Sequence, residues 1–571
     1  MKQTLFLLVF LTITIPCSFS QNRLSPIWKY SKTDNIKTAE GSVSESWPEV
    51  NLMLSWERQG LCWIDKDLVL KNYFFADKKD TLLELSFSLQ GDVQAVYINQ
   101  KQVSRSIPNS FWSERDKKQV VIIPDSVLHK NARNEIIILI NNLSYTGGLS
   151  HNSCSIRDIR ETTGNSISLD IPKVDHVYLA SDKRSFTITA MNNEDTRVRL
   201  VISSDFHRTV LNKSFVMKAG KTEQIIDLEA LKLPPGFYEC VAISEGKTYC
   251  GDVEWIAVQP EDIPCPAGKP VGFDDYWQSA LKELRTTEPD FSLKKVDSLC
   301  SSFRDGYVVE MTSLNNLVIR GYYFVPKKAG KHPAILQLPG YGYGFQDTEG
   351  FVSREDDVAE LALCVRGHGI SRDVFNPWDT MTLWAVGACN RDEYIYRSIY
   401  MDCVRAVEFL KSRPEIDGTR IGVMGGSQGG GLAIATAGLC QKDIAVLGIF
   451  DPWLCDFRDQ AAIRTMINRE LEFFSNYPTV QCDAQQIFSV LDFADTKYFA
   501  ADITCPVRFT ASLFDDDCPV HDGFSVYNNL KTNRQYFVYP NDSHLAESGQ
   551  YSALYDMLKG LLLDMQENHP R

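Results

Sequence analysis

The feature that most constrains the fold is a serine set among glycines, Gly425-Gly426-Ser427-Gln428-Gly429. Residues 421–424 before it predict a strand, and the small residues of 430–439 predict a helix after it. Glycines two residues to either side let the chain turn sharply from strand to helix. Such a turn exposes the serine Oγ and places the next backbone N–H at a helix N-terminus, where it can bind an oxyanion. The pattern therefore predicts a nucleophilic serine.

Three consecutive glycines, residues 429–431, open the predicted helix. Each weakens a helix by about 1 kcal/mol relative to alanine. A reason other than helix stability is therefore expected to keep them there.

The pattern of predicted elements divides the chain. After residue 270 helices and strands alternate, which predicts a parallel sheet covered on both faces, and we assign 266–571 to an α/β-hydrolase domain. Residues 21–165 and 172–258 show short strands without helices. The expected fold is therefore multidomain, with two all-β units followed by a C-terminal α/β-hydrolase domain.

The two β units differ in character. Residues 94–99 and 134–140, the latter followed by Gly147-Gly148, resemble strands of the jelly-roll, galactose-binding-like domains attached to glycan-active enzymes. Sugar binding and a purely structural role both remain open for 21–165. About seven strands in 172–258 suggest an immunoglobulin-like (Ig-like) sandwich, which we expect to act as a spacer.

The N-terminus predicts export. Lys2 precedes an apolar segment over residues 5–15, and small residues at 18 and 20 favour cleavage of a signal peptide, residues 1–20, after Ser20. An uncleaved N-terminal anchor is the alternative. A secreted or periplasmic location permits disulfides. Cys240 and Cys250 flank a predicted three-residue hairpin loop, which would place them opposite each other and predicts a disulfide.

Charge and motif content exclude several classes of function. With 59 basic and 73 acidic residues the net charge is −14, which argues against nucleic acid and anionic membranes. No apolar run beyond the N-terminus reaches the roughly 18 residues of a membrane span. The nine histidines lack metal-ligand spacing, the acidic run 515–517 lacks the spacing of a calcium loop, and no phosphate-binding loop occurs. We therefore expect no metal and no cofactor.

A serine nucleophile requires a base and an orienting acid, which in this fold class follow in the order serine, acid, histidine. Downstream of Ser427 lie His521, His544 and His569. We favour His544, because it follows the last predicted strand. The acid should follow the strand that ends at Leu513, and the spacing alone does not choose among the three aspartates of 515–517.

Several stretches of residues 270–565 match, in order, one known family: 273–277, 319–326, 396–397, 402–408, 420–423, 426–430, 452–457 and 515–519. This half of the chain resembles the acetyl xylan esterase and cephalosporin C deacetylase family (carbohydrate esterase family 7). The resemblance implies a triad of Ser427, Asp515 and His544, because the family's acid stands three residues before a Cys-Pro pair. It also implies oxyanion donors at the backbone N–H groups of Tyr341 and Gln428, and no metal or organic cofactor.

Three motifs depart from the family pattern, at residues 339–341, 366–368 and 544–545. All three border the expected pocket, where Arg366, His368 and Trp453 are the candidate substrate contacts. For His368 a local packing change is the alternative. The resemblance implies a secreted esterase that acts on acetylated plant cell-wall polysaccharides or oligosaccharides, such as acetyl xylan, and it allows a closed homo-oligomer.

Two other functions compete with this interpretation of the sequence. A serine peptidase of the prolyl oligopeptidase type carries a propeller, and residues 27–258 show no repeat of about 40–50 residues. A catalytically idle, glycan-binding hydrolase fold would not need the intact order of serine, aspartate and histidine.

Overall fold

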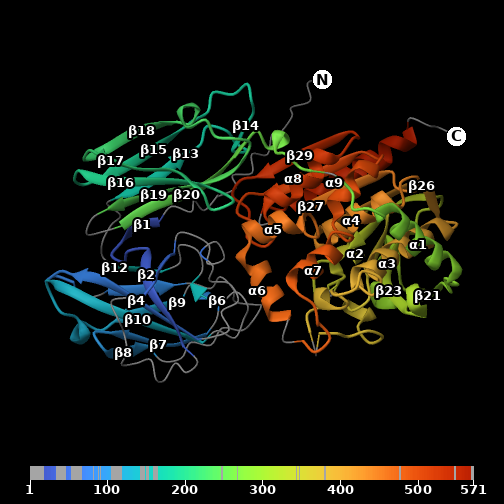
Figure 1. Cartoon of the computed structure of the whole chain (residues 1–571), viewed down its shortest axis with the longest axis horizontal. Coiled ribbons are helices and arrows are strands. Elements are labelled where there is room, and N and C mark those ends of the chain that lie inside the picture. Colours follow the sequence, from blue (N-terminus) through green and yellow to red (C-terminus); the bar gives the residue numbers. More distant parts are fainter. Residues whose placement is uncertain are drawn as a thin grey trace.

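Figure 1 shows the protein as a computed structural model. The structure describes residues 19–567, apart from these segments: 34–46, 53–58, 60–66, 81–82, 88, 91, 105–118, 142–147, 150–153, 159–164, 246–248, 267, 343, 346, 379–380, 475–476 and 545–547. Residues 1–18, which form most of the predicted signal peptide, lie outside the described residues. Within the described part, no helix has the length and apolar character needed to cross a membrane.

The first β unit packs a six-stranded sheet, ordered β3-β2-β4-β10-β7-β8, against a three-stranded sheet, ordered β12-β5-β9. Its strands are β2 (Ile27–Thr33), β3 (Glu49–Asn51), β4 (Asp67–Ala76), β5 (Leu83–Phe87), β6 (Leu89–Gln90), β7 (Asp92–Ile98), β8 (Lys101–Ser104), β9 (Gln119–Ile123), β10 (Ala132–Asn141), β11 (Gly148–Leu149) and β12 (Ser155–Asp158). Side chains alternate along β10, so Ile136 and Ile138 join this core while Ile137 faces away from it.

The second β unit pairs a sheet ordered β1-β20-β19-β16-β17, with β14 beside β20, with the sheet β13-β15-β18. Its strands are β1 (Phe19–Asn22), β13 (Ser166–Asp170), β14 (Val177–Tyr178), β15 (Ser185–Asn192), β16 (Thr196–Ser204), β17 (Thr209–Met217), β18 (Gly220–Asp227), β19 (Gly236–Glu245) and β20 (Tyr249–Val258). The N-terminal strand β1 thus belongs to the sheet of this second unit. The N-terminal part of the chain is therefore a β-sheet region with two separate cores.

The predicted disulfide between Cys240 and Cys250 is wrong, since both are free thiols. In the β19–β20 hairpin Cys240 stands opposite Glu254, so Cys250 lies four residues out of register with it. The backbone N–H of Cys250 instead donates to Ser244 Oγ at 2.8 Å. A disulfide does occur between Cys389 and Cys482, 93 residues apart, which sequence spacing did not indicate.

The C-terminal half is an α/β-hydrolase-like domain built on a nine-stranded sheet ordered β21-β22-β23-β25-β24-β26-β27-β28-β29. Its strands are β21 (Ser292–Lys295), β22 (Arg304–Thr312), β23 (Val318–Pro326), β24 (His332–Leu338), β25 (Ala359–Cys364), β26 (Ile416–Ser427), β27 (Val446–Pro452), β28 (Val507–Ser512) and β29 (Arg534–Tyr539). Its helices are α1 (Phe273–Thr286), α2 (Glu349–Val352), α3 (Ile395–Ser412), α4 (Gln428–Leu439), α5 (Phe457–Ile463), α6 (Thr465–Phe474), α7 (Ala484–Leu491), α8 (Val520–Asn529) and α9 (Gln550–Glu567). The strands from β25 to β29 pair in parallel.

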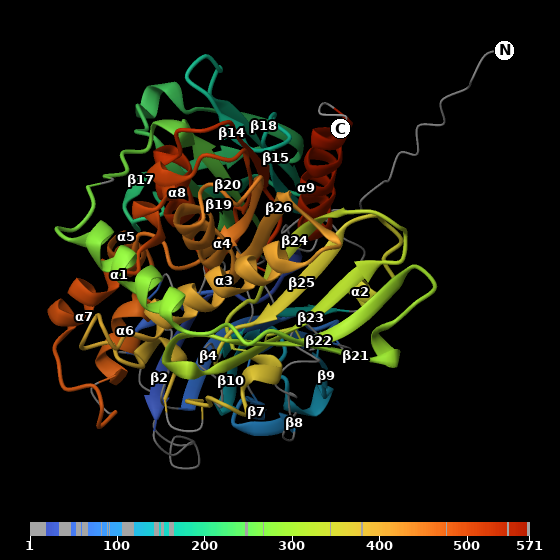
Figure 2. The same ribbon diagram turned by 90° about the vertical axis from the view of Figure 1, so that its right-hand side faces the viewer.

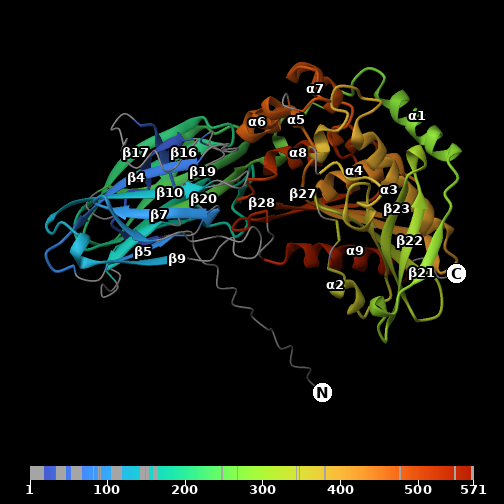
Figure 3. The same cartoon turned by 90° about the horizontal axis from the view of Figure 1, so that it is seen from below.

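Helices cover both faces of this sheet, as the alternation of elements predicts (Figures 2 and 3). Ile335, Met424 and Val446 pack on one face against Leu558 of α9. Their sequence neighbours on the same strands point to the opposite face, where the large core of the domain includes residues of α3 and α4. Because the central strands run in parallel, their carboxyl ends meet at one edge, which is where ligands bind in sheets of this type.

The second β unit shares apolar packing with the catalytic domain. Phe237 of β19 packs on Phe524 of α8, with ring centroids 5.5 Å apart. Asp205 Oδ2, in the turn between β16 and β17, lies 2.7 Å from His521 Nδ1. The neighbouring His207 Nε2 lies 2.7 Å from the carbonyl oxygen of Ile463. The two units are therefore joined by one continuous core, by the buried contact of Asp205 with His521 and by the partly buried contact of His207.

A buried ion pair fixes the outer part of the sheet. Arg304 on β22 and Glu360 on β25 are both fully buried, and Arg304 Nη1 donates to Glu360 Oε1 at 2.7 Å. Arg304 also donates to Asp356 Oδ1 at 2.8 Å and to the carbonyl oxygen of Phe351 at 3.1 Å.

Arg304→Ala should lower the free energy of unfolding of the α/β-hydrolase-like domain by about 3–5 kcal/mol, because it removes the fully buried one of the two arginines that pair with Glu360 and leaves only the partly exposed Arg354. Differential scanning calorimetry measures the effect. Arg197→Ala is the matched control, since Arg197 is 61% exposed and should leave the transition unchanged. Equal stability of the two variants would contradict this account.

Candidate active site

Ser427 lies at the sharp turn between β26 and α4. Its backbone has φ 56° and ψ −127°, a conformation that costs energy for any residue other than glycine and that concentrates at functional sites. Strand β26 ends at Ser427, and helix α4 begins at Gln428. The strand–turn–helix context predicted from the sequence is therefore present, with the serine at its apex.

The glycines at the start of α4 are explained by close packing. A Cβ on Gly429 would lie 2.3 Å from the carbonyl oxygen of Leu338, at the end of β24. A Cβ on Gly431 would lie 2.1 Å from the carbonyl oxygen of Trp453, just beyond β27. The helix thus begins in contact with two strand ends, which no larger residue permits.

His544 and Asp515 meet beside the same sheet edge. Asp515 follows β28 and His544 follows β29, and Asp515 Oδ2 lies 2.7 Å from His544 Nδ1. The other carboxylate oxygen, Oδ1, accepts the backbone N–H groups of Asp517 at 2.8 Å and Cys518 at 2.7 Å. The structure therefore brings Asp515, of the three candidate aspartates, to the histidine.

The neighbouring aspartates face elsewhere. Asp516 is exposed, and Asp517 Oδ1 lies 3.7 Å from Arg464 Nη2. His521, the other candidate base, lies at the boundary with the second β unit in contact with Asp205. His569 lies outside the described residues.

The electrostatics of the dyad favour a charged imidazole. Burial disfavours the imidazolium, but the charge of Asp515 and its hydrogen bond outweigh this and hold the pKa of His544 well above 6.5. Since Asp515 occupies Nδ1, the nitrogen available for proton transfer is Nε2.

A thiol lies beside the serine. Cys518 Sγ is 3.8 Å from Ser427 Oγ, and the thiol also makes a side-chain hydrogen bond with His544. Burial raises the pKa of Cys518 to about 11, so the thiol is neutral near pH 7 and does not compete with Ser427 as nucleophile.

The side chain of Gln428 organises the loop that follows β24. Its Nε2 donates to the carbonyl oxygens of Pro339 at 3.2 Å and Gly340 at 3.3 Å, and its Oε1 accepts the hydroxyl of Tyr396 at 2.6 Å. Gln428 is the first residue of α4, so its own backbone N–H has no partner within the helix. These contacts place the loop that carries Tyr341 next to the start of the helix.

His368 closes the same network. Its Nε2 accepts from Gly342 N at 3.2 Å and from Gln428 Nε2 at 3.1 Å, so this nitrogen carries no proton and the ring is the neutral tautomer with hydrogen on Nδ1. Burial lowers its pKa to about 4, which keeps it neutral. His368 is fully buried behind the loop, so its burial fits the alternative of a local packing change and corrects the candidate substrate contact.

Arg366 requires the same correction. Only 3% of it is exposed, and its guanidinium forms a bidentate pair with Asp402 of α3, with Nε to Oδ2 at 2.9 Å and Nη2 to Oδ1 at 2.6 Å. It is a core ion-pair residue. Trp453, the third candidate, lies beside Tyr341 with ring centroids 5.2 Å apart.

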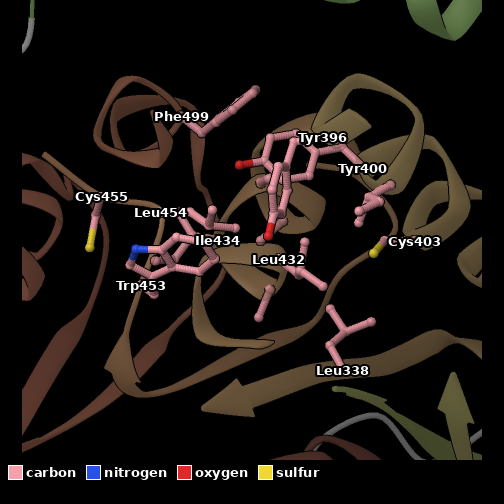
Figure 4. Packing of buried hydrophobic residues seen from close by; sticks show 14 of the residues in the cluster. Leu338, Tyr396, Tyr400, Cys403, Leu432, Ile434, Trp453, Leu454, Cys455 and Phe499 are labelled. Carbon is pink, nitrogen blue, oxygen red and sulfur yellow. The ribbon is translucent and has the colours of Figure 1, made fainter. Parts of the chain in front are cut away.

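Aromatic rings enclose the region next to Tyr341. Trp378 lies 5.1 Å from Tyr341 between ring centroids, Trp384 lies 6.2 Å from Trp453, and Tyr396 lies 6.0 Å from Trp453. Figure 4 shows Trp453 and Tyr396 in the packed cluster around the beginning of α4. The segments that carry Trp384 and α7 are tied together by the disulfide between Cys389 and Cys482.

Sequence reasoning missed one buried acid. Asp451 lies at the end of β27, and its carboxylate accepts Ser512 N at 2.7 Å and Ser512 Oγ at 2.6 Å. Burial, followed by the charge of Asp515, raises the pKa of Asp451 well above its ordinary value. The sequence signal for Asp451 was its position at a strand end, directly before the Pro452-Trp453 pair.

Gly431→Ala should destabilise the catalytic domain by about 1–3 kcal/mol, because the added methyl group would overlap the carbonyl oxygen of Trp453 and force α4 away from β27. Thermal unfolding measures the change. Gly418→Ala is the control, since a Cβ there meets no atom within 4 Å. If both variants unfold alike, close packing is not what requires glycine at 431.

Comparisons with known proteins show which proteins this chain is similar to. "Acetyl esterase Axe7A" of Xylanibacter ruminicola is 28% identical over 369 residues, which cover 62% of this chain and 80% of that protein. Among solved structures, an acetyl xylan esterase from Paenibacillus sp. R4 aligns with a TM-score of 0.48 at 25% identity, over 53% of this chain and 98% of that one. Acetyl Xylan Esterase 1 from Thermoanaerobacterium sp. aligns with a TM-score of 0.45 at 25% identity, with the same two coverages.

The family model described as acetyl xylan esterase (AXE1) matches residues 265–560, which is more than half of the chain and contains every candidate site residue. The chain therefore belongs to the acetyl xylan esterase (AXE1) family of carboxylic ester hydrolases.

Proposed function

We propose that this protein is a secreted or periplasmic serine esterase that removes O-acetyl groups from plant cell-wall glycans, with acetyl xylan or its oligosaccharides as substrate. The family match and the name of the Xylanibacter relative support the acetyl ester as the reacting group. The predicted signal peptide supports export.

The observation that carries the proposal is one constellation at the sheet edge. Ser427 stands on a strained strand-to-helix turn, and a histidine whose Nδ1 lies 2.7 Å from a buried carboxylate follows the last strand. This arrangement supports the proposal that Ser427 is the nucleophile, His544 the base and Asp515 the orienting acid, which follow one another in the order usual for the fold.

In the proposed reaction His544 Nε2 takes the proton of Ser427 as Oγ attacks the acetyl carbonyl carbon. The backbone N–H groups of Tyr341 and Gln428 bind the oxyanion, and removing one such donor typically costs about 10²–10³ in rate. As the bond between the acetyl carbon and the sugar oxygen breaks, His544 protonates that oxygen, the sugar leaves with a free hydroxyl, and the acetyl group stays on Ser427. Water activated by His544 releases acetate and restores the serine.

The rings around Tyr341 and Trp453 support a short acyl group. The rings of Tyr341 and Trp453 meet edge to face with their centroids 5.2 Å apart, and only 8% of the surface of Trp453 is exposed. A closed aromatic wall leaves little room for added methylenes, each of which should cost on the order of 1–3 kcal/mol.

The β-sheet region belongs to the same proposal. We assign 21–165 to a jelly-roll, galactose-binding-like unit and 172–258 to an Ig-like spacer. The sheet of six strands facing one of three supports a sandwich for the first unit, and two sheets around one core support a sandwich for the second.

Purified protein spanning residues 21–571 should release acetate from acetylated xylan and hydrolyse p-nitrophenyl acetate faster than p-nitrophenyl butyrate. Ser427→Ala should lower the acetate rate by more than about 10³-fold while the protein stays folded, because it removes the nucleophile. Wild-type protein without esterase activity would favour an idle glycan-binding fold, and cleavage of proline-containing peptides would favour a peptidase. Comparable acetyl and butyryl rates would point to a general carboxylesterase.

Asp515→Asn should change both the rate and its pH dependence. Turnover should fall by about 10⁴-fold, as asparagine favours the wrong imidazole tautomer. Activity requires neutral His544, so the wild-type rate should fall as pH drops through a midpoint above 6.5. Without the aspartate charge, burial lowers the pKa, and this midpoint should move to lower pH.

Asp516→Asn is the matched control, as Asp516 is exposed and adjacent in sequence. Its rate and pH midpoint should stay close to those of the wild type. A larger effect at 516 than at 515 would show that the acid is misassigned.

A further inference from the structure

Three potential metal ligands of different chemistry converge at the serine. Among the residues that the structure describes, Asp515, Cys518 and His544 are the one group of at least three such side chains with ligand atoms all within 4.8 Å of one another. Asp515 and Cys518 are buried, and 22% of the His544 side chain is exposed, so the histidine is the member of the group that solvent reaches. Ser427 Oγ is 3.8 Å from the Cys518 sulfur.

The hydrogen bonds divide these side chains into ligands and support. Asp515 Oδ2 is held at His544 Nδ1, 2.7 Å away, so that pair leaves Nε2 for an ion. A histidine that binds a metal commonly donates its other ring N–H to a carboxylate, and this outer partner orients the ring. Cys518 is anchored as well, since its backbone N–H donates to Asp515 Oδ1 at 2.7 Å.

We propose that Cys518 Sγ and His544 Nε2 form an inhibitory binding site for thiophilic divalent cations, of which Zn²⁺ is the representative. Sulfur and imidazole nitrogen are the donors that Zn²⁺ prefers, whereas Mg²⁺ takes oxygen donors. Asp515 stays in the outer shell on Nδ1. Water and the hydroxyl of Ser427 are available for the remaining positions of a tetrahedral ion.

Zinc binding at this site exchanges a proton for the metal ion. The thiol loses one proton to solvent, the sulfur–zinc and nitrogen–zinc bonds form, and nothing is oxidised or reduced. The lone pair of Nε2, which the proposed esterase reaction needs to accept the serine proton, is then engaged by the ion. Inhibition therefore rests on the proposed function, while binding itself does not.

The first experiment titrates the full chain with zinc chloride during hydrolysis of p-nitrophenyl acetate. Wild-type activity should fall and return on addition of a chelator, and magnesium chloride at the same concentrations should have no effect. Cys518→Ser should raise the zinc concentration for half-inhibition by more than about tenfold, because a coordinating side chain is lost. The control variant Cys300→Ser lacks a partly exposed thiol elsewhere, and zinc should inhibit it at the same concentrations as the wild type. Equal zinc sensitivity of Cys518→Ser and the wild type would overturn the site.

The second experiment reads binding without activity. Cobalt(II) added to the full chain should produce a thiolate-to-metal charge-transfer band in the near ultraviolet. The band should persist in Ser427→Ala and disappear in Cys518→Ser and Cys518→Ala, two variants that guard against a folding defect in either one. A wild-type protein without the band would overturn the proposal. A protein that shows the band and lacks esterase activity would instead refute the proposed function alone.

Discussion

The close approach of α4 to the ends of β24 and β27 is the constraint on which the rest of the site depends. It admits only glycine at 429 and 431, where a Cβ would overlap backbone oxygens of Leu338 and Trp453. Three glycines are poor helix formers, so tertiary packing supplies the stability that local propensity does not. Because of this packing, the N-terminus of α4 lies against the loop after β24, and the Gln428 side chain can reach Pro339 and Gly340. The strained backbone of Ser427 is held in place by these contacts.

Two buried carboxylates lie side by side behind the serine, and their surroundings give them different character. Burial raises the pKa of Asp515, but two backbone N–H groups and the pairing with His544 act in the opposite direction and favour its anion. Asp451 is bonded only to neutral groups, Ser512 and more distantly Gln550, and it feels the charge of Asp515. The charge of Asp515 therefore adds to burial in favouring the protonated form of Asp451. The negative charge is thus concentrated at the atom that orients the histidine.

Local patterns predicted much of this structure, and spatial relations account for what they missed. The elbow at Ser427 and the alternation of helices and strands depend on short-range rules, and both are present. The choice of Asp515 depended on family resemblance, since three adjacent aspartates differ only in the direction their side chains take. The prediction of a disulfide at Cys240 failed because the β19–β20 hairpin has a different register. A shift of a few residues changes the cross-strand partner of every residue in a hairpin.

Other predictions from the sequence failed because they also depended on how residues are arranged in space. The pairing of Cys389 with Cys482 spans 93 residues, and nothing local specifies it. Arg366 and His368 were expected at the pocket because they depart from the family motif or adjoin the departure. Burial decides their roles instead: Arg366 neutralises Asp402, and His368 receives two N–H groups from the loop and from Gln428. A sequence motif places a residue near a site without saying which way it faces.

The shared core between the second β unit and the catalytic domain has a consequence for how such a chain can evolve. Phe237 and Trp255 of that β unit belong to the same apolar cluster as the helices of the hydrolase half. A recombination breakpoint in the linker near residue 265 would leave both halves with an uncovered apolar surface, which favours aggregation. This packing favours keeping the two units together, whereas the first β unit has a core of its own.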